Sequence, residues 1–359
     1  MFVASLLLAL TQPAAADPVA HRLYPPQPLI ETTRLGQAIN FDIELTNETD
    51  GPLELYAVRA AVRDPSGAIV QRLEVNDNGA SPGIATLPAT SFAPGEPHTL
   101  YNPFHTLAAD IPIGRIDLEF LFLDADENEI VETMTVSPQP YAPKTRLVLP
   151  VEGRVLVWDG HDFYGHHRRF SFSSPMMKAL EITSNPSRYS FDFVRADEDG
   201  NFHAAGSDAP DDNYSYGMDV VAPAAGTVVA LYNEAGDAPA GVDPELFARD
   251  PLAALFGNYL VIDHGNGEYS QMGHFRTGSI TVKVGDRVAQ GQKVARAGMS
   301  GTSLFPHLHY QLATGPGLSA EGLPAYFDNI ARVLGETTAD VRPATWIDSG
   351  DLVETVTQR

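Results

Sequence analysis

Short apolar runs separated by glycine-containing turns constrain the fold of this chain more than any other feature. Between residues 257 and 303, runs such as 259–262 and 282–284 alternate with turns such as 264–267. Runs of this length, rich in Val and Ile, are typical of β-strands. The stretch from residue 146 onward is similar, and a helical insertion is expected only within residues 236–256. The sequence therefore predicts an all-β architecture of short antiparallel strands.

Residues 17–143 show the period-two alternation of half-buried strands. Apolar and polar residues alternate over 39–45 and again over 116–122, and turn-forming residues bound both stretches. This pattern predicts a β-sandwich. We expect an immunoglobulin-like accessory domain, because this region holds no catalytic constellation. The proline-rich stretch 137–143 suits an extended connection, so a second all-β domain is expected over 144–350.

Composition limits the partners and the ligands. The 359 residues suffice for two domains that each bury a core. Asp and Glu number 46 against 23 Lys and Arg, and the formal charge of −23 argues against nucleic acid or anionic lipid as the main partner. Cysteine is absent. Any metal must therefore bind to His, Asp or Glu.

Residues 1–16 have the pattern of a secretory signal peptide. An apolar run is followed by small residues up to Ala16, where cleavage is expected, although the basic residues that usually precede such a run are missing. No other segment has the eighteen or more apolar residues needed to span a bilayer. We therefore expect an exported protein, periplasmic or extracellular, without a membrane span.

The segment 306–310, Pro-His-Leu-His-Tyr, carries the strongest chemical signal. Two histidines two apart on a strand project from one face, and imidazole is both a metal ligand and a general base. Together with the preceding blocks 257–267, 269–275, 282–288, 291–292 and 298–303, the segment resembles the catalytic core of the lysostaphin-like (LytM-type) zinc metallopeptidases, over about residues 150–315. The resemblance implies an endopeptidase with one Zn²⁺ per chain, acting on peptide bonds of peptidoglycan stem peptides or cross-links.

The resemblance also implies roles for single residues. Zinc is usually bound in this family by His-x-x-x-Asp and by the second His of His-x-His, here His309. His307 matches the histidine implied as general base, and His274 matches the one implied to stabilise the transition state. The simplest match to His-x-x-x-Asp, residues 215–219, has Ser215 in place of histidine.

Aligning the family motif with this chain in a shifted register gives a different aspartate as the metal ligand. Asp219 directly precedes 222–229, Ala-Pro-Ala-Ala-Gly-Thr-Val-Val, which matches a hairpin that follows the ligand position in the family. The ligand is therefore expected upstream, at Asp192 within the aromatic-flanked stretch 188–193. Asp219 stays an alternative.

The first histidine is then expected within 160–170, as in a subgroup that carries it on a separate, earlier strand. His166 and His167 are both candidates. On a strand, His166 shares a face with Phe170, whereas His167 shares one with Arg169 and so faces a polar groove if the aromatic face packs inward. We favour His167 and keep His166.

Two further interpretations stay open. Ser215 raises the possibility of an inactive cell-wall-binding or regulatory module that keeps the fold without the metal. Alternatively, the N-terminal domain binds a protein partner, and the C-terminal domain serves as its scaffold.

Overall fold

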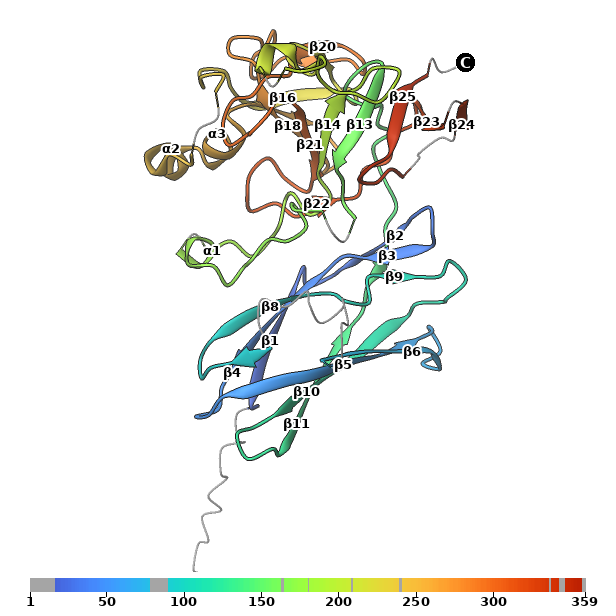
Figure 1. The fold of residues 1–359 in the computed structure, drawn as a ribbon, viewed down its shortest axis with the longest axis vertical. Coiled ribbons are helices and arrows are strands. Elements are labelled where there is room, and N and C mark those ends of the chain that lie inside the picture. The colour runs from blue at the N-terminus through green and yellow to red at the C-terminus, as the bar shows by residue number, and fades with distance from the viewer. Residues whose placement is uncertain are drawn as a thin grey trace, which may run out of the picture.

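A computed structural model of the chain describes residues 17–77, 90–162, 165–179, 181–207, 209–238, 241–335, 337–341 and 346–356. The expected signal peptide, residues 1–16, lies outside them. Two parts follow each other along the long axis, and each has its own hydrophobic core (Figure 1). Strands dominate both parts and almost all pair antiparallel, which confirms the all-β prediction.

The core of the N-terminal part is built from the predicted alternating residues. Ile39, Phe41, Ile43 and Leu45 are fully buried, but the chain changes sheets between Ile39 and Asp42, so the predicted strand 39–45 is divided in two. The immunoglobulin-like topology stays a prediction. The first sheet contains β1 (Val19–Tyr24), β4 (Asp42–Asn47) and β8 (Pro97–Tyr101). The second contains β11 (Glu129–Val136), β10 (Arg115–Leu123), β5 (Leu53–Arg63) and β6 (Ile69–Asn76), with β7 (Ser91–Phe92) beside β5. The third contains β12 (Gln139–Pro140), β2 (Leu29–Thr32), β3 (Gln37–Ile39) and β9 (Thr106–Leu107).

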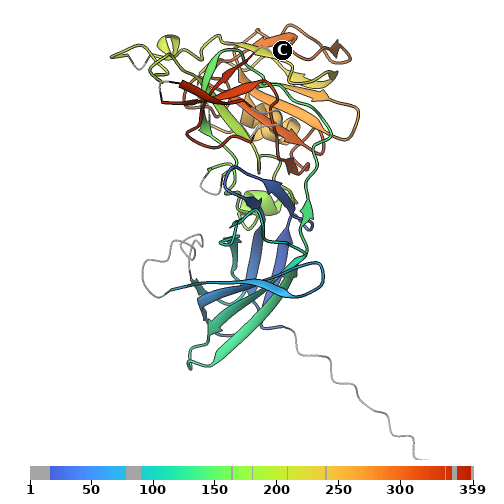
Figure 2. The ribbon, with the colours of Figure 1, turned by 90° about the vertical axis from the view of Figure 1, so that its right-hand side faces the viewer.

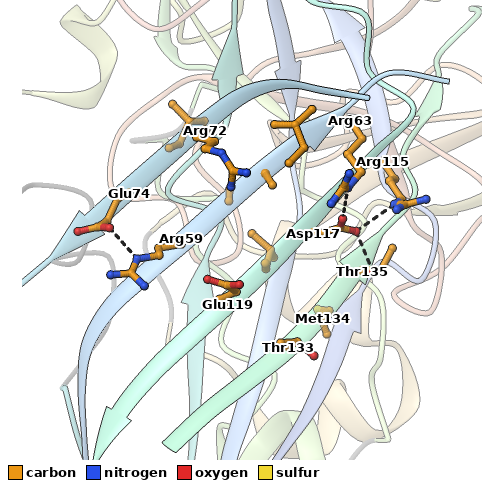
Figure 3. A pocket seen from close by; sticks show the side chains of 15 residues that line it. Arg59, Arg63, Arg72, Glu74, Arg115, Asp117, Glu119, Thr133, Met134 and Thr135 are labelled. Atoms are coloured by element: carbon orange, nitrogen blue, oxygen red, sulfur yellow. Dashed lines mark hydrogen bonds and ion pairs between the residues drawn. The ribbon is translucent and has the colours of Figure 1, made fainter. Parts of the chain in front are cut away.

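A shallow hollow of about 820 Å³ lies on the outer face of β5, β6, β10 and β11 (Figure 3). Arginines and carboxylates line it and neutralise each other. Arg59 pairs with Glu74 at 2.7 Å, and Arg63 and Arg115 share Asp117 at 2.5 and 3.1 Å. Four arginines, Arg59, Arg63, Arg72 and Arg115, thus face three carboxylates, Glu74, Asp117 and Glu119, so the hollow is a surface of mostly paired charges.

One sheet of eleven strands organises the C-terminal part, with a two-stranded sheet beside it (Figures 1 and 2). Its order is β19 (Arg287–Val288), β16 (Gly226–Tyr232), β17 (Asn258–Asp263), β18 (Tyr269–Phe275), β21 (Leu308–Ala313), β14 (Phe191–Arg195), β13 (Arg154–Asp159), β25 (Leu352–Thr355), β23 (Ile330–Leu334) and β24 (Thr337–Val341), with β22 (Gly322–Leu323) on β21. The small sheet pairs β15 (Asp219–Val221) with β20 (Lys293–Arg296).

The predicted helical insertion is confirmed by α2 (Pro244–Arg249) and α3 (Pro251–Phe256). Each begins with proline after an aspartate whose side chain caps it, Asp243 and Asp250. The sequence did not predict α1 (Pro175–Ala179) or the 3₁₀ turn η2 (Pro210–Asp212). Within the described ranges, no helix has the length and apolar character required to cross a membrane.

A glycine lets α3 approach the large sheet. A Cβ on Gly273 would lie 2.6 Å from the Cβ of Phe256, so only glycine allows this contact on β18. The ring of Phe256 then lies 4.6 Å from that of His309. The helix thereby covers one side of the histidines described next.

Candidate metal centre

Pairing register brings residues far apart in the sequence into one row across the large sheet. Asp192 on β14 lies opposite Asp159 on β13 and opposite His309 on β21. His309 in turn lies opposite Gly273 on β18, next to His274. Adjacent strands thus gather these side chains on rigid backbone.

Asp192 is the centre of the arrangement. Its buried carboxylate has Oδ1 3.0 Å from Nδ1 of His309 and 3.4 Å from Nε2 of His307, and Oδ2 3.8 Å from Nε2 of His167. Burial acts to raise the pKa of Asp192, but His167 and His307 outweigh it and hold that pKa well below its usual range. We call Asp192, His167, His307 and His309 the His/Asp cluster.

A chain of amides determines which nitrogen of His309 carries hydrogen. The carbonyl of Gly315 accepts from Nε2 of Gln271 at 2.8 Å, and Oε1 of Gln271 accepts from Nε2 of Gln311 at 2.9 Å. Oε1 of Gln311 therefore faces Nε2 of His309, 3.0 Å away, and accepts its hydrogen. In the neutral ring, Nδ1 is left with a lone pair directed at Asp192.

The other two histidines of the cluster are held in the same way. Nδ1 of His307 lies 2.9 Å from the carbonyl of Phe305, and Nδ1 of His167 lies 2.7 Å from Oδ2 of Asp159. Each neutral ring then presents the lone pair of Nε2 to Asp192. Lone pairs facing an ionised carboxylate repel it unless a metal ion, or a proton on the ring, lies between them. The donor set, imidazole nitrogens and a carboxylate held by outer partners, fits a Zn²⁺ ion.

His166 lies beside the cluster but differs in exposure. Ligand atoms of Asp159, His166, His167 and Asp192 all lie within 4.8 Å of one another. The side chain of His166 is 69% exposed, against 16% for His167, and its Nδ1 lies 3.0 Å from Oδ2 of Asp159. The hydrogen bond to Asp159 raises the pKa of His166. The structure thus brings both predicted histidines together, in a turn instead of on the expected strand, and leaves His166 exposed and His167 mostly covered.

His274 adds a buried imidazole on the side of His307. Its ring centroid lies 4.8 Å from that of His307, and its Nδ1 lies 2.8 Å from the carbonyl of Ser300. Burial lowers the pKa of His274 well below its usual value. The backbone at His274 has φ of 61°, a strained conformation for a residue other than glycine that is common in functional sites.

Residues 215–219 lie elsewhere. The carboxylate of Asp219 lies 2.5 Å from Nζ of Lys293 and 3.4 Å from Nε of Arg296, and 52% of its side chain is exposed. Oγ of Ser215 accepts a hydrogen bond from the amide of Arg195 at 2.9 Å. This placement agrees with the shifted register, in which Asp219 follows the ligand position.

The sequence did not identify three residues that contact the cluster or support it, Asp159, Gln311 and Gln271. Gln311 stands two residues after His309, so strand periodicity places both on one face, and this signal could have revealed it. Asp159 ends a strand directly before the predicted histidine stretch. Nothing local to Gln271 points to a contact with Gln311.

Partly exposed aromatic residues form a rim beside His307. The ring of Phe305 lies 4.8 Å from His307 and 5.1 Å from Trp158, whose ring lies 5.3 Å from Phe202. Trp158 is 45% exposed and the neighbouring Leu304 is 82% exposed. An extended ligand reaching His307 therefore meets apolar side chains.

Comparison with known proteins locates a family within the chain. Residues 207–317 match the model of Peptidase family M23. Peptidoglycan DD-endopeptidase ShyA of Vibrio cholerae is 43% identical over 56 residues, which is 16% of this chain and 13% of that protein. An uncharacterized metalloprotease of Haemophilus influenzae is 34% identical over 101 residues, 28% of this chain and 17% of that protein. The alignments thus span under a fifth of these relatives.

Solved structures show weaker similarity. The catalytic domain of lysostaphin from Staphylococcus simulans is 23% identical, with a TM-score of 0.23, over 37% of this chain and 74% of that one. A putative peptidase M23 from Pseudomonas aeruginosa is 17% identical, with a TM-score of 0.27, over 72% and 83%. The family model, which includes His274, His307 and His309 but begins after His167 and Asp192, is the stronger match. Residues 207–317 thus match peptidase family M23, which confirms the resemblance to the lysostaphin-like peptidases.

Proposed function

We propose that this protein is a zinc metalloendopeptidase whose single Zn²⁺ is held by His167, Asp192 and His309. The convergence of three imidazole nitrogens on the buried carboxylate of Asp192 is the observation that supports it most. Three protein ligands leave a catalytic zinc one open position. Bound zinc supplies a Lewis acid that activates water and polarises a carbonyl group.

His307 is the general base of this proposal. Its hydrogen bond to the carbonyl of Phe305 fixes the ring and leaves Nε2 free to take a proton from water. His274 is oriented in the same way by the carbonyl of Ser300, so as a neutral ring it accepts a hydrogen bond at Nε2. In this form His274 can position the water by accepting one of its hydrogens while His307 takes the other. Donation to a developing oxyanion would require the protonated ring.

The substrate we propose is a peptide bond of peptidoglycan, in a stem peptide or a cross-link. Support comes from family M23 and from the named activity of the V. cholerae relative. Export follows from this substrate, because peptidoglycan lies outside the cytoplasmic membrane, and the signal-like residues 1–16 agree with it. We further propose that residues 17–143 and 144–350 are the two domains.

Metal content and cleavage test the proposal together. Elemental analysis of the purified protein should find about one zinc per chain, lost in Asp192→Ala and kept in Asp219→Ala. Purified peptidoglycan fragments should be cut by the wild type and left intact by His307→Ala, which should retain zinc. A folded wild type that binds no zinc would overturn the proposal, and cleavage of a protein substrate with intact wall fragments would overturn the substrate.

A further inference from the structure

One ligand of the proposed centre is held differently from the other two. Asp192 and His309 lie on neighbouring strands of the large sheet. His167 belongs to residues 160–190, which leave the sheet after β13 and return to it at β14. In Figure 1 this segment, which includes α1, lies below the large sheet and next to the upper strands of the N-terminal part. The position of His167 therefore depends on what this segment packs against.

A buried aspartate of the N-terminal part binds the segment at two points. Asp42, the first residue of β4, is fully buried. Its Oδ1 accepts a hydrogen bond from Nη1 of Arg168, and its Oδ2 accepts one from Nη1 of Arg188 at 2.6 Å. Both guanidinium groups are buried as well, and Nη2 of Arg168 also donates to the carbonyl of Phe41 at 3.1 Å. Arg188 also pairs with Glu321. We call Asp42, Arg168 and Arg188 the node. Asp42 is the buried carboxylate that both arginines share, so removing its charge would weaken the pairing of two buried cations and loosen the segment.

The node connects directly to His167. Arg168 is the next residue in the chain, so the carboxylate of Asp42 holds the backbone within one residue of the ligand. Near Arg188, Nδ2 of the fully buried Asn185 donates to the carbonyl of His167 at 3.0 Å. Arg168 is thus coupled to His167 through the chain itself. Arg188 is coupled to it through Asn185, whose carbonyl accepts a hydrogen bond from the amide of Arg188 at 3.2 Å.

An aromatic contact adds to the docking. The ring of Tyr24, on β1, stacks on Phe172 with centroids 4.1 Å apart and planes inclined by 11°. Both rings are buried. The segment that carries His167 is therefore packed against β1 and β4 through both charge and apolar surface.

We infer that the N-terminal part completes the metal centre, with Asp42 as a positioning residue that holds His167 through Arg168 and Arg188. The inference rests on the proposed function, because it explains what holds one metal ligand of that site, His167, in position. It gives the N-terminal part a role beyond that of a spacer. A shift of β4 relative to the large sheet would move His167 away from Asp192 and His309.

Zinc affinity of the full-length protein tests this inference. Competition with a chromophoric chelator should show at least tenfold weaker zinc binding in Asp42→Asn than in wild type. Tyr24→Leu, which removes only the ring stacking, should weaken binding by a smaller factor and serves if Asp42→Asn does not fold. Leu118→Ala is the matched control, because it opens a cavity in the N-terminal core without touching the node.

Hydrogen exchange of the metal-free protein supplies a readout independent of zinc. Exchange over residues 165–175 should rise in Asp42→Asn and stay near the wild-type level in Leu118→Ala. A folded Asp42→Asn that binds zinc within twofold of wild type would overturn the inference while leaving the proposed function intact. A wild type without zinc affinity would instead overturn the proposed function.

Discussion

Asp159 and Asp192 face each other on β13 and β14, and their carboxylates address opposite nitrogens of one imidazole ring. Oδ2 of Asp159 lies 2.7 Å from Nδ1 of His167, and Oδ2 of Asp192 lies 3.8 Å from Nε2. Burial acts to raise the pKa of Asp159, but His166 and His167 outweigh it and hold that pKa below its usual range. In the proposed centre the two carboxylates therefore have separate tasks, orientation for Asp159 and metal binding for Asp192.

Replacing Asp159 with Asn should weaken zinc binding by about 10- to 100-fold, the usual cost of losing an outer partner of a ligand. The amide cannot offer His167 an ionised acceptor, so the ring loses its fixed tautomer. Chelator competition measures the change, with Asp219→Asn as control. Unchanged affinity in Asp159→Asn would show that His167 needs no such partner.

His166 and His167 should respond differently to removal. His167→Ala deletes a buried donor of the cluster, so about one zinc per chain should fall to near zero. His166→Ala removes an exposed ring and should keep both zinc and most activity. Zinc analysis after gel filtration distinguishes them, and the reverse pattern would identify His166 as the ligand.

His274→Ala should lower kcat about 100-fold, within the usual range for a lost acid or base, while zinc content stays at the wild-type level. Steady-state cleavage of a soluble peptidoglycan fragment measures the effect. His264→Ala is the matched control, since that ring bonds the carbonyl of Ala225 and Oγ of Ser270 in a hairpin. Loss of zinc in His274→Ala would make it a ligand and contradict the assigned role.

Two acidic residues away from the proposed metal centre, Asp162 and Asp348, should make the stability of the folded protein depend on pH. Burial and the neighbouring Asp162 raise the pKa of Asp348 to about 8, whereas an unfolded aspartate titrates near 4. The folded state therefore binds the extra proton between these values, and stability falls as pH rises from about 4 to about 8. Asp348→Asn keeps a donor to Asp162 without the charge.

Thermal unfolding of Asp348→Asn should accordingly give a higher Tm than wild type at pH 8.5 and nearly the same Tm at pH 4.5. Burial and the charge of Asp348 raise the pKa of the nearby buried Glu31, so removing that charge also relieves Glu31 and acts in the same direction at pH 8.5. A lower Tm for the variant at pH 8.5 would contradict this prediction.

Local patterns predicted the strands well, because burial on one face leaves a direct trace in the sequence. The alternation at 116–122 became β10, with Ile116, Leu118, Phe120 and Phe122 buried. The division of 39–45 between β3 and β4 could not be predicted, because both halves keep the same alternation. Only the contacts of Asn102, which bonds the carbonyls of Ile39 and Phe41, mark the change of sheet.

The site was harder to predict, since its members are joined by register between distant strands. His307 and His309 are adjacent in one motif, and sequence sufficed to propose them. The carboxylate of Asp159 matters only because β13 lies beside β14. Asp42 is more remote still, since its contact with Arg168 crosses from one hydrophobic core to the other.

The pairing of β13 with β25 sets an order of events during synthesis. Arg154, Val155 and Leu156 pair with Glu354, Val353 and Leu352, respectively, so the strand that ends in Asp159 has an open edge until those residues leave the ribosome. The amino-terminal strands that hold Arg168 are made long before. A nascent chain therefore cannot finish the sheet that carries Asp159 before Leu352–Thr355 are available, and a product interrupted before Leu352 would expose an unpaired strand edge beside an immature centre.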